Sequence, residues 1–179
     1  MKIAVIGSGS AGSRHLRVLK LIAGVTPIAV PQRQSRITEL EALGYATAVD
    51  LATVRTAGAT AAIVATNTAR HLEDAALAFQ NDLDVLLEKP MAVDAKQAHK
   101  LCELAVKTGR KLYVGCDLRF SESLNNYRDQ LALLGKIHSV RIEAMSYLPD
   151  WRPNRPYHET YSARADEGGV LRDLIHEID

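Results

Sequence analysis

The first fifteen residues, MKIAVIGSGSAGSRH (1–15), decide the fold of this chain. A short apolar run at 3–6 leads directly into Gly7-Ser-Gly9-Ser-Ala-Gly12, and a helix-compatible segment follows. This order predicts a strand, a glycine-rich turn and a helix, the context in which the pattern G-x-G-x-x-G binds a dinucleotide. Gly7 would permit the tight turn, Gly9 would let the backbone approach a pyrophosphate, and Gly12 would let the helix pack closely on the strand.

The start of that helix is the expected phosphate site. Helix N-termini present backbone N–H groups and a partial positive charge, and both favour an anion. We therefore expect Ser10 and Ala11, with the three glycines, to contact the cofactor. Glycine-rich turns also form for purely structural reasons, so the pattern gains its meaning from the alternation of strands and helices behind it.

Short apolar runs and helical patterns alternate over roughly the first 120 residues. Strands are expected at 2–7, 26–30, 46–49, 61–66, 84–88 and 111–116, and several are apolar on both faces, as strands covered by helices must be. Between them, 11–22, 37–43, 70–80 and 95–108 carry apolar residues at helical spacing. This alternation predicts an α/β fold, a doubly wound parallel Rossmann sheet, in a dinucleotide-binding domain at 1–120.

The pattern changes after Cys116. We expect a serine-capped helix at 121–134, a long alternating strand at 137–147, a proline-rich loop at 149–156 and the beginning of a helix at 168–179. A lone strand and part of a helix do not make a domain. Residues 121–179 are therefore predicted to be the incomplete start of an α+β domain for substrate binding and oligomerisation. The apolar face and unpaired edge of the strand favour either a homodimer through this segment or poor order beyond about Leu148.

Composition excludes several function classes. The 179 residues are 47% hydrophobic and carry a net charge of +1, which does not favour nucleic acid or a membrane surface as a partner. The two cysteines, Cys102 and Cys116, have no redox or metal-ligand spacing, which is typical of reduced structural thiols. The apolar N-terminal run is too short for a signal peptide, and no apolar stretch reaches membrane-spanning length. We expect a cytoplasmic protein.

Four further segments point to one family. They are ATNTARH at 65–71, LEKP at 87–90, GCDLRF at 115–120 and GGVLRDLIH at 168–176. With the glycine loop, they make the chain resemble the glucose–fructose oxidoreductase and inositol dehydrogenase family (Gfo/Idh/MocA), NAD(P)-dependent enzymes that act on sugars and polyols. The resemblance covers essentially the whole chain but about the first half of a usual member. The stretch SYLPDWRP at 146–153 is similar to a branch found among surface-polysaccharide and sugar-nucleotide genes.

The resemblance implies three catalytic candidates. Lys89 of Glu-Lys-Pro is expected beside the nicotinamide. The peptide bond that links this lysine to Pro90 is often cis in the family. The alternative for Lys89 is an ordinary surface lysine at a strand end. His176 would be the general base and Asp173 its carboxylate neighbour. The family usually separates these two by four residues and this chain by three, which leaves open whether Asp173, His176 or Asp179 reaches the substrate. No metal is expected, because one helix offers too few ligands.

The cofactor candidates follow from the same motifs and from the glycine pattern. The expected cofactor-binding residues are Gly7, Gly9, Ser10, Ala11, Gly12, Arg33, Thr66, Asn67, His71, Glu88 and Lys89. For His71 the alternative is a packed helix residue, and His15 is interpreted as structural or as a neighbour of the phosphates. Trp151, with Arg152 and Arg155, is either part of a sugar site or part of a solvated loop.

The end of the second strand favours NADP over NAD. Strict NAD sites place an acid there for the ribose 2′-hydroxyl, but Val30-Pro-Gln-Arg-Gln-Ser-Arg36 contains none. Gln32, Arg33, Ser35 and Arg36 would instead suit a 2′-phosphate.

Two hypotheses for the function remain open at this point. In the first, the protein is an oxidoreductase that moves a hydride between a nicotinamide and a hydroxyl-bearing carbon of a sugar, polyol or sugar nucleotide. In the second, it is a truncated, catalytically inactive chain that binds a dinucleotide.

Overall fold

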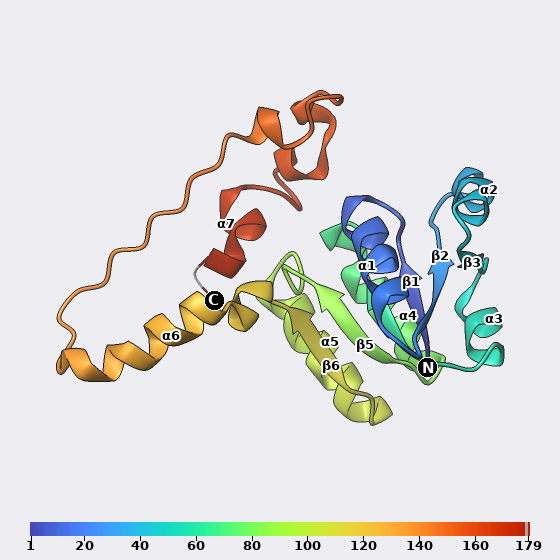
Figure 1. Ribbon diagram of the computed structural model, residues 1–179, viewed down its shortest axis with the longest axis horizontal. Coiled ribbons are helices and arrows are strands. Elements are labelled where there is room, and N and C mark those ends of the chain that lie inside the picture. Colours follow the sequence, from blue (N-terminus) through green and yellow to red (C-terminus); the bar gives the residue numbers. More distant parts are fainter. Residues whose placement is uncertain (178) are drawn as a thin grey trace. The chain divides into compact units, whose positions relative to one another are not determined.

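The computed structural model describes residues 1–177 and 179, which form two compact units, Met1–Gly115 and Cys116–Asp179. The first unit contains one six-stranded parallel sheet with the order β3-β2-β1-β4-β5-β6 (Figure 1). The strands are β1 (Lys2–Ile6), β2 (Thr26–Val30), β3 (Ala46–Thr47), β4 (Ala59–Val64), β5 (Asp84–Glu88) and β6 (Leu112–Gly115). This order is that of the doubly wound Rossmann fold, so the predicted fold class is confirmed. The unit boundary lies at 115/116, near the predicted domain boundary at 120.

Helices follow the strands of the first unit in alternation. They are α1 (Ser10–Leu21), α2 (Ser35–Ala42), α3 (Leu51–Thr56), the 3₁₀ turn η1 (Thr68–Arg70), α4 (His71–Gln80) and α5 (Ala95–Thr108). Helix α3 was not predicted from the sequence, although Asp50 caps it by accepting a hydrogen bond from the Thr53 N–H at 2.7 Å. Asp94 caps α5 in the same way, and Gly109 ends that helix in the left-handed conformation.

Alternate strand residues build two separate cores, one on each face of the sheet. Ala62 and Val64 of β4 belong to the larger core, beneath α3, α4 and α5. Ile63, between them in sequence, belongs to the smaller core with Leu16 and Leu19 of α1 and Leu40 of α2. Strands buried on both faces read as continuous apolar runs, which is why their alternation was not visible in the sequence.

The second unit consists of short helices joined by extended segments. They are η2 (Asp117–Phe120), α6 (Glu122–Gln130), η3 (Leu131–Leu134), η4 (Leu148–Trp151), η5 (Tyr157–Glu159), η6 (Tyr161–Ala163), α7 (Val170–Asp173) and η7 (Ile175–Glu177). Ser121 caps α6, as predicted. Nowhere in residues 1–177 and 179 is there a helix with the length and apolar character needed to cross a membrane.

Two predictions for the second unit are wrong. Residues 137–147 form no strand, because a strand is defined by its ladder and none of the described residues pairs with this segment. The helix expected at 168–179 is only four residues long and is followed at Ile175 by a 3₁₀ turn. Asp173 and His176 therefore do not share the face of one continuous helix.

Candidate functional site

The glycine loop has the geometry that its sequence predicts. Gly7 lies at a φ of +93°, and a Cβ there would stand 2.6 Å from the Ala65 carbonyl oxygen. A Cβ on Gly12 would stand 2.0 Å from the Gly7 carbonyl oxygen, whereas a Cβ on Gly9 would have no neighbour within 4 Å. Two glycines are thus required by the protein's own backbone. The third faces open space, where a pyrophosphate has room to approach.

The first turn of α1 closes with the Ser13 N–H donating to the Gly9 carbonyl at 2.9 Å. By helix geometry, the N–H groups of Ser10, Ala11 and Gly12 precede this pattern and point out of the helix end. Ser10 is exposed and Ala11 is half-buried. The predicted phosphate contacts therefore lie at an accessible helix N-terminus.

Arg36 is the basic residue that the structure brings to the glycine loop. Its Nη2 donates to the Ser8 carbonyl at 3.2 Å, and its guanidinium also pairs with Glu39. Arg33, the predicted cofactor residue, is exposed in the turn before α2. Arg33 and Arg36 are both expected to suit a 2′-phosphate, and Arg36 contacts the glycine loop through the Ser8 carbonyl.

The loop after β4 is held by a buried carboxylate. Asp74 is 3% exposed and accepts hydrogen bonds from Thr66 Oγ1 at 2.7 Å and from Arg70 Nη2 at 2.8 Å. The hydrogen bond that Arg70 donates to Asp74 raises the pKa of the Arg70 guanidinium, although burial acts in the opposite direction. The hydroxyl proton of Thr66 is thereby used inside the loop. Asn67 is exposed and directly precedes η1.

His71 is the first residue of α4 and is 1% exposed. Its Nδ1 lies 2.9 Å from the Pro90 carbonyl oxygen and its Nε2 lies 3.2 Å from the Thr66 carbonyl oxygen. Burial lowers its pKa, although the backbone contacts oppose this. Both ring nitrogens therefore contact the protein's own backbone, as the packed-helix alternative expects, and the ring joins two loops.

The Glu-Lys-Pro segment follows β5. Burial alone would raise the pKa of Glu88, but the hydrogen bond and charge of His15 and the charge of Arg14 outweigh it and lower this pKa. His15 Nε2 lies 2.6 Å from Glu88 Oε1, and Arg14 Nη2 lies 3.9 Å from the same oxygen. Lys89 is half-buried, and its bond to Pro90 is cis.

These loops lie together because of the strand order. Strands β1, β4 and β5 are consecutive neighbours in the parallel sheet, so the residues that follow them emerge at one edge. The glycine loop, residues 65–71 and residues 88–90 are those segments. In open α/β sheets, ligands bind outside the carboxyl ends of the strands.

The second unit holds the remaining catalytic candidates. Asp173 is 4% exposed, and burial followed by the charge of Asp173 raises the pKa of Tyr161. His176 lies in η7 with its Nε2 3.6 Å from Glu177 Oε1. Asp179 pairs with Arg119 through two hydrogen bonds, which lower the pKa of Asp179. Asp173 and Asp179 are thus both engaged inside this unit.

The sequence Gly168-Gly169 is explained by close packing. A Cβ on Gly168 would stand 2.3 Å from the Tyr161 carbonyl oxygen and 2.4 Å from that of Ser162, and Gly169 starts α7 at a φ of +100°. These glycines position the short helix that ends at Asp173.

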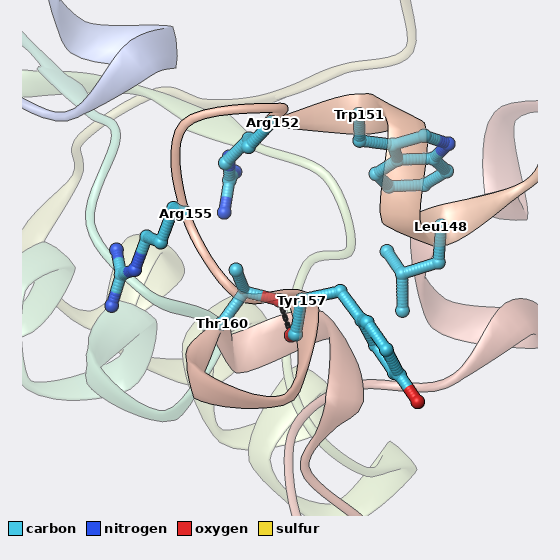
Figure 2. A pocket seen from close by; sticks show the side chains of 6 residues that line it. All are labelled: Leu148, Trp151, Arg152, Arg155, Tyr157 and Thr160. Carbon is cyan, nitrogen blue, oxygen red and sulfur yellow. Dashed lines mark hydrogen bonds between the residues drawn. The ribbon is translucent and has the colours of Figure 1, made fainter.

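Trp151, Arg152 and Arg155 are brought together around a small pocket (Figure 2). Figure 2 shows Trp151 and Leu148 on one side and the two arginines on the other. The space among them has no room for a water-sized molecule. Trp151, Arg155 and Tyr157 are all exposed in this loop.

Sequence reasoning gave too little weight to two residues. His15 was interpreted as structural or as a neighbour of the phosphates, and its contact with Glu88, 73 positions away, was not foreseen. Asp74 was not singled out, although its spacing of four from Arg70 was a readable signal for a helical ion pair. Among the described residues, no three His, Cys, Asp or Glu side chains group as a metal site would require.

The sheet order, the glycine loop and the helix N-terminus define a dinucleotide-binding protein of the Rossmann class. Residues 1–116 match the model of the Gfo/Idh/MocA oxidoreductase family with an NAD-binding Rossmann fold. The chain therefore belongs to this family.

Several relatives are similar along nearly the whole chain. The inositol 2-dehydrogenase of Pseudarthrobacter chlorophenolicus is 32% identical over 100% of this chain and 52% of its own length. The rhizopine catabolism protein MocA of Rhizobium meliloti is 27% identical over 99% and 55%. The crystal structure of myo-inositol 2-dehydrogenase from Lactobacillus plantarum superposes with a TM-score of 0.83 at 22% identity, covering 99% of this chain and 54% of that one. The chain spans about half the length of the relatives it matches.

Proposed function

We propose that this chain supplies the cofactor-binding part of an NAD(P)-dependent oxidoreductase acting on a sugar, polyol or sugar nucleotide. The observation that carries the proposal is the meeting of three loops at the carboxyl edge of β1, β4 and β5: the glycine loop, residues 65–71 and Glu-Lys-Pro. Membership of an oxidoreductase family with an NAD-binding fold and the names of the inositol dehydrogenases support it.

The residues of the glycine loop have one role in this proposal. Gly7, Gly9, Ser10, Ala11 and Gly12 hold the pyrophosphate. The nicotinamide, when bound, supplies or accepts the hydride at its C4.

The remaining candidates act around the nicotinamide and on the substrate. Thr66 and Asn67 offer backbone to the cofactor, while His71 and Glu88 act through the segments that they fix. Lys89 orients and polarises the substrate hydroxyl, and His176 accepts its proton.

Cofactor preference is the sharpest test of the binding half. We propose NADP(H) over NAD(H), because residues 30–36 contain no acid and Arg36 lies at the glycine loop. Fluorescence titration should give tighter binding of NADPH than of NADH. Arg36→Ala should weaken NADPH binding about tenfold, the effect of losing a charged hydrogen bond, and leave NADH binding unchanged.

Arg33→Ala is the matched control, since Arg33 is an exposed arginine in the turn directly before α2, three residues from Arg36. Its effect on NADPH binding should be smaller than that of Arg36→Ala. NADH binding ten times tighter than NADPH would refute the preference, and Arg33→Ala alone weakening NADPH would transfer the role to Arg33.

Turnover tests the catalytic half. In a protein that contains this chain and oxidises a sugar or polyol, Lys89→Ala and His176→Ala should each cut turnover at least about a hundredfold. Cofactor affinity should change little. Retained activity in His176→Ala, with loss in Asp173→Asn or Asp179→Asn, would give the base role to a carboxylate.

A second function is favoured by the length comparison. In this second function the chain binds a dinucleotide and turns over no substrate; what supports it is that the chain spans about half the length of its relatives. The 179-residue chain, assayed against a panel of sugars and sugar nucleotides, separates the two: saturable NADPH binding without turnover supports the second function. The homodimer and the cytoplasmic location both stay predictions. Analytical ultracentrifugation of the chain would test for the homodimer.

A further inference from the structure

Lys89 lies between two residues that are each fixed by a histidine. Glu88, on one side, contacts His15 Nε2 through its Oε1 at 2.6 Å. Pro90, on the other side, contacts His71 Nδ1 through its carbonyl oxygen at 2.9 Å. Both neighbours of Lys89 are therefore contacted by a histidine of another element, Glu88 at its side chain and Pro90 at its carbonyl oxygen.

Each histidine comes from a helix that begins at a proposed cofactor loop. His15 belongs to α1, whose N-terminus is the glycine loop. His71 is the first residue of α4, directly after residues 65–70, and its Nε2 contacts the Thr66 carbonyl of that loop at 3.2 Å. The two loops are themselves in contact, since a Cβ on Gly7 would meet Thr66 Cγ2 at 3.0 Å.

The contact between His15 and Glu88 differs from an ordinary surface pair. It is part-buried, it joins helix to strand across 73 positions, and the Arg14 guanidinium also lies 3.9 Å from the same carboxylate oxygen. The chain also contains an ordinary pair of the same type. His99 and Glu103 are exposed, lie one helical turn apart on α5, and approach to 3.4 Å.

We infer that His15 is a positioning residue: by binding Glu88, and with His71 on the opposite flank, it holds Lys89 in a fixed place relative to the glycine loop. The inference rests on the proposed function of Lys89 and of the two loops. In this inference α1 has two roles: its N-terminus binds the pyrophosphate, and its residue His15 positions Lys89.

The test is the rate at which acetic anhydride acetylates Lys89, measured by peptide mass spectrometry on the 179-residue chain. The internal reference is Lys2, whose Nζ donates to the Ala57 carbonyl at 2.8 Å. Lys2 is the first residue of β1 and lies at the amino end of the parallel strands, whereas Lys89 follows the carboxyl end of β5. Global loosening raises both rates together, whereas a positioning role changes Lys89 alone.

His15→Leu should raise the acetylation rate of Lys89 relative to Lys2 about fivefold, the factor that loss of one hydrogen bond allows. His15→Gln, which keeps a donor for Glu88, should stay within about twofold of the wild-type chain. His99→Leu, the matched control on α5, should change nothing. A His15→Leu rate equal to that of His99→Leu would overturn the inference.

A second variant covers the case in which His15→Leu does not fold. His15→Asn keeps a polar side chain on α1 but is too short to reach Glu88, so it should also speed the acetylation of Lys89. An unchanged rate in this variant would overturn the inference as well.

Adding NADPH separates the inference from the proposed function. In the wild-type chain NADPH should slow acetylation of Lys89. If it does not, while His15→Leu still speeds the reaction, the cofactor site is wrong and the positioning role of His15 stands.

Discussion

The two units of this chain bury different kinds of side chain. With the exception of Cys116, every buried apolar residue in the described part of the chain lies in the first unit. Apart from Gly168, the other buried residues described in the second unit are polar or charged: Thr160, Ser162, Glu167 and Asp173. Large apolar side chains there are exposed, among them Phe120, Leu133 and Met145.

This contrast explains why one unit has a sheet and the other does not. In the first unit each strand has neighbours and a helix-covered face, so apolar burial and backbone hydrogen bonds reinforce each other. In the second, residues 137–147 have an alternating pattern but no partner strand among the described residues. A local pattern specifies a strand only when another strand is present to receive it.

Hydrogen exchange should give the largest difference between the units. Amides at 62–64, in the central strand β4, should exchange at least about a thousandfold more slowly than those at 140–145, because opening the first group requires near-global unfolding. The measurement is exchange mass spectrometry at low micromolar concentration. Equal protection of the two segments in a monomeric sample would contradict the contrast.

Truncating a buried leucine sharpens the same comparison. Leu87→Ala, at a fully buried position of β5, should lower the free energy of unfolding by about 2–5 kcal/mol. Leu133→Ala, at a position that is 77% exposed, should change it by less than about 0.5 kcal/mol. Urea denaturation measures both. A cost above 2 kcal/mol for Leu133→Ala would reveal a core in the second unit.

The glycine loop offers a matched pair within the first unit. Gly12→Ala places a Cβ against the Gly7 carbonyl and should destabilise the fold by about 1–3 kcal/mol. Gly9→Ala meets no protein atom, so it should leave stability nearly unchanged while weakening NADPH binding. Thermal denaturation and titration separate the two effects, and a stable Gly12→Ala variant would contradict the packing.

The smallest expected effect is on the pH dependence of stability. Burial lowers the pKa of His71, so below about 6.5 the unfolded chain binds a proton that the folded chain does not. Stability should fall as pH drops from about 6.5 toward the folded pKa, by up to about 1.4 kcal/mol per pH unit. Urea midpoints at several pH values measure this slope. His71→Asn should flatten it, and an unchanged slope would assign it to other groups.

Most of the fold of the first unit could be predicted from the sequence, because the sequence signals for its elements are local. The glycine loop, the capped helices and the apolar runs each specify a nearby structure, and the helix expected at 70–80 is α4. The contact between His15 and Glu88 is different, because no local pattern links residues that meet only after β1 and β5 have joined one sheet. Helix α3 was missed although its cap, Asp50, was readable.

The second unit resisted prediction for a physical reason. The strand expected at 137–147 and the helix expected at 168–179 were inferred from local sequence patterns. Such a pattern indicates which face of an element is apolar, but it does not indicate which other element covers that face. The glycines at 168 and 169 were readable only as a family motif. Their role depends on the backbone at 161–162, which the structure brings against them.

The division of the first unit into two cores makes the sheet a partition between independent compartments. Helix α1, which carries the glycine loop, packs in one compartment, and α4, which follows the loop at 65–71, packs in the other. Substitutions in separate compartments share no partners, so their energetic costs should add. Substitutions in the compartment that supports the glycine loop should therefore leave the support of the loop at 65–71 unchanged. The two compartments are coupled through the contacts at the carboxyl edge of the sheet.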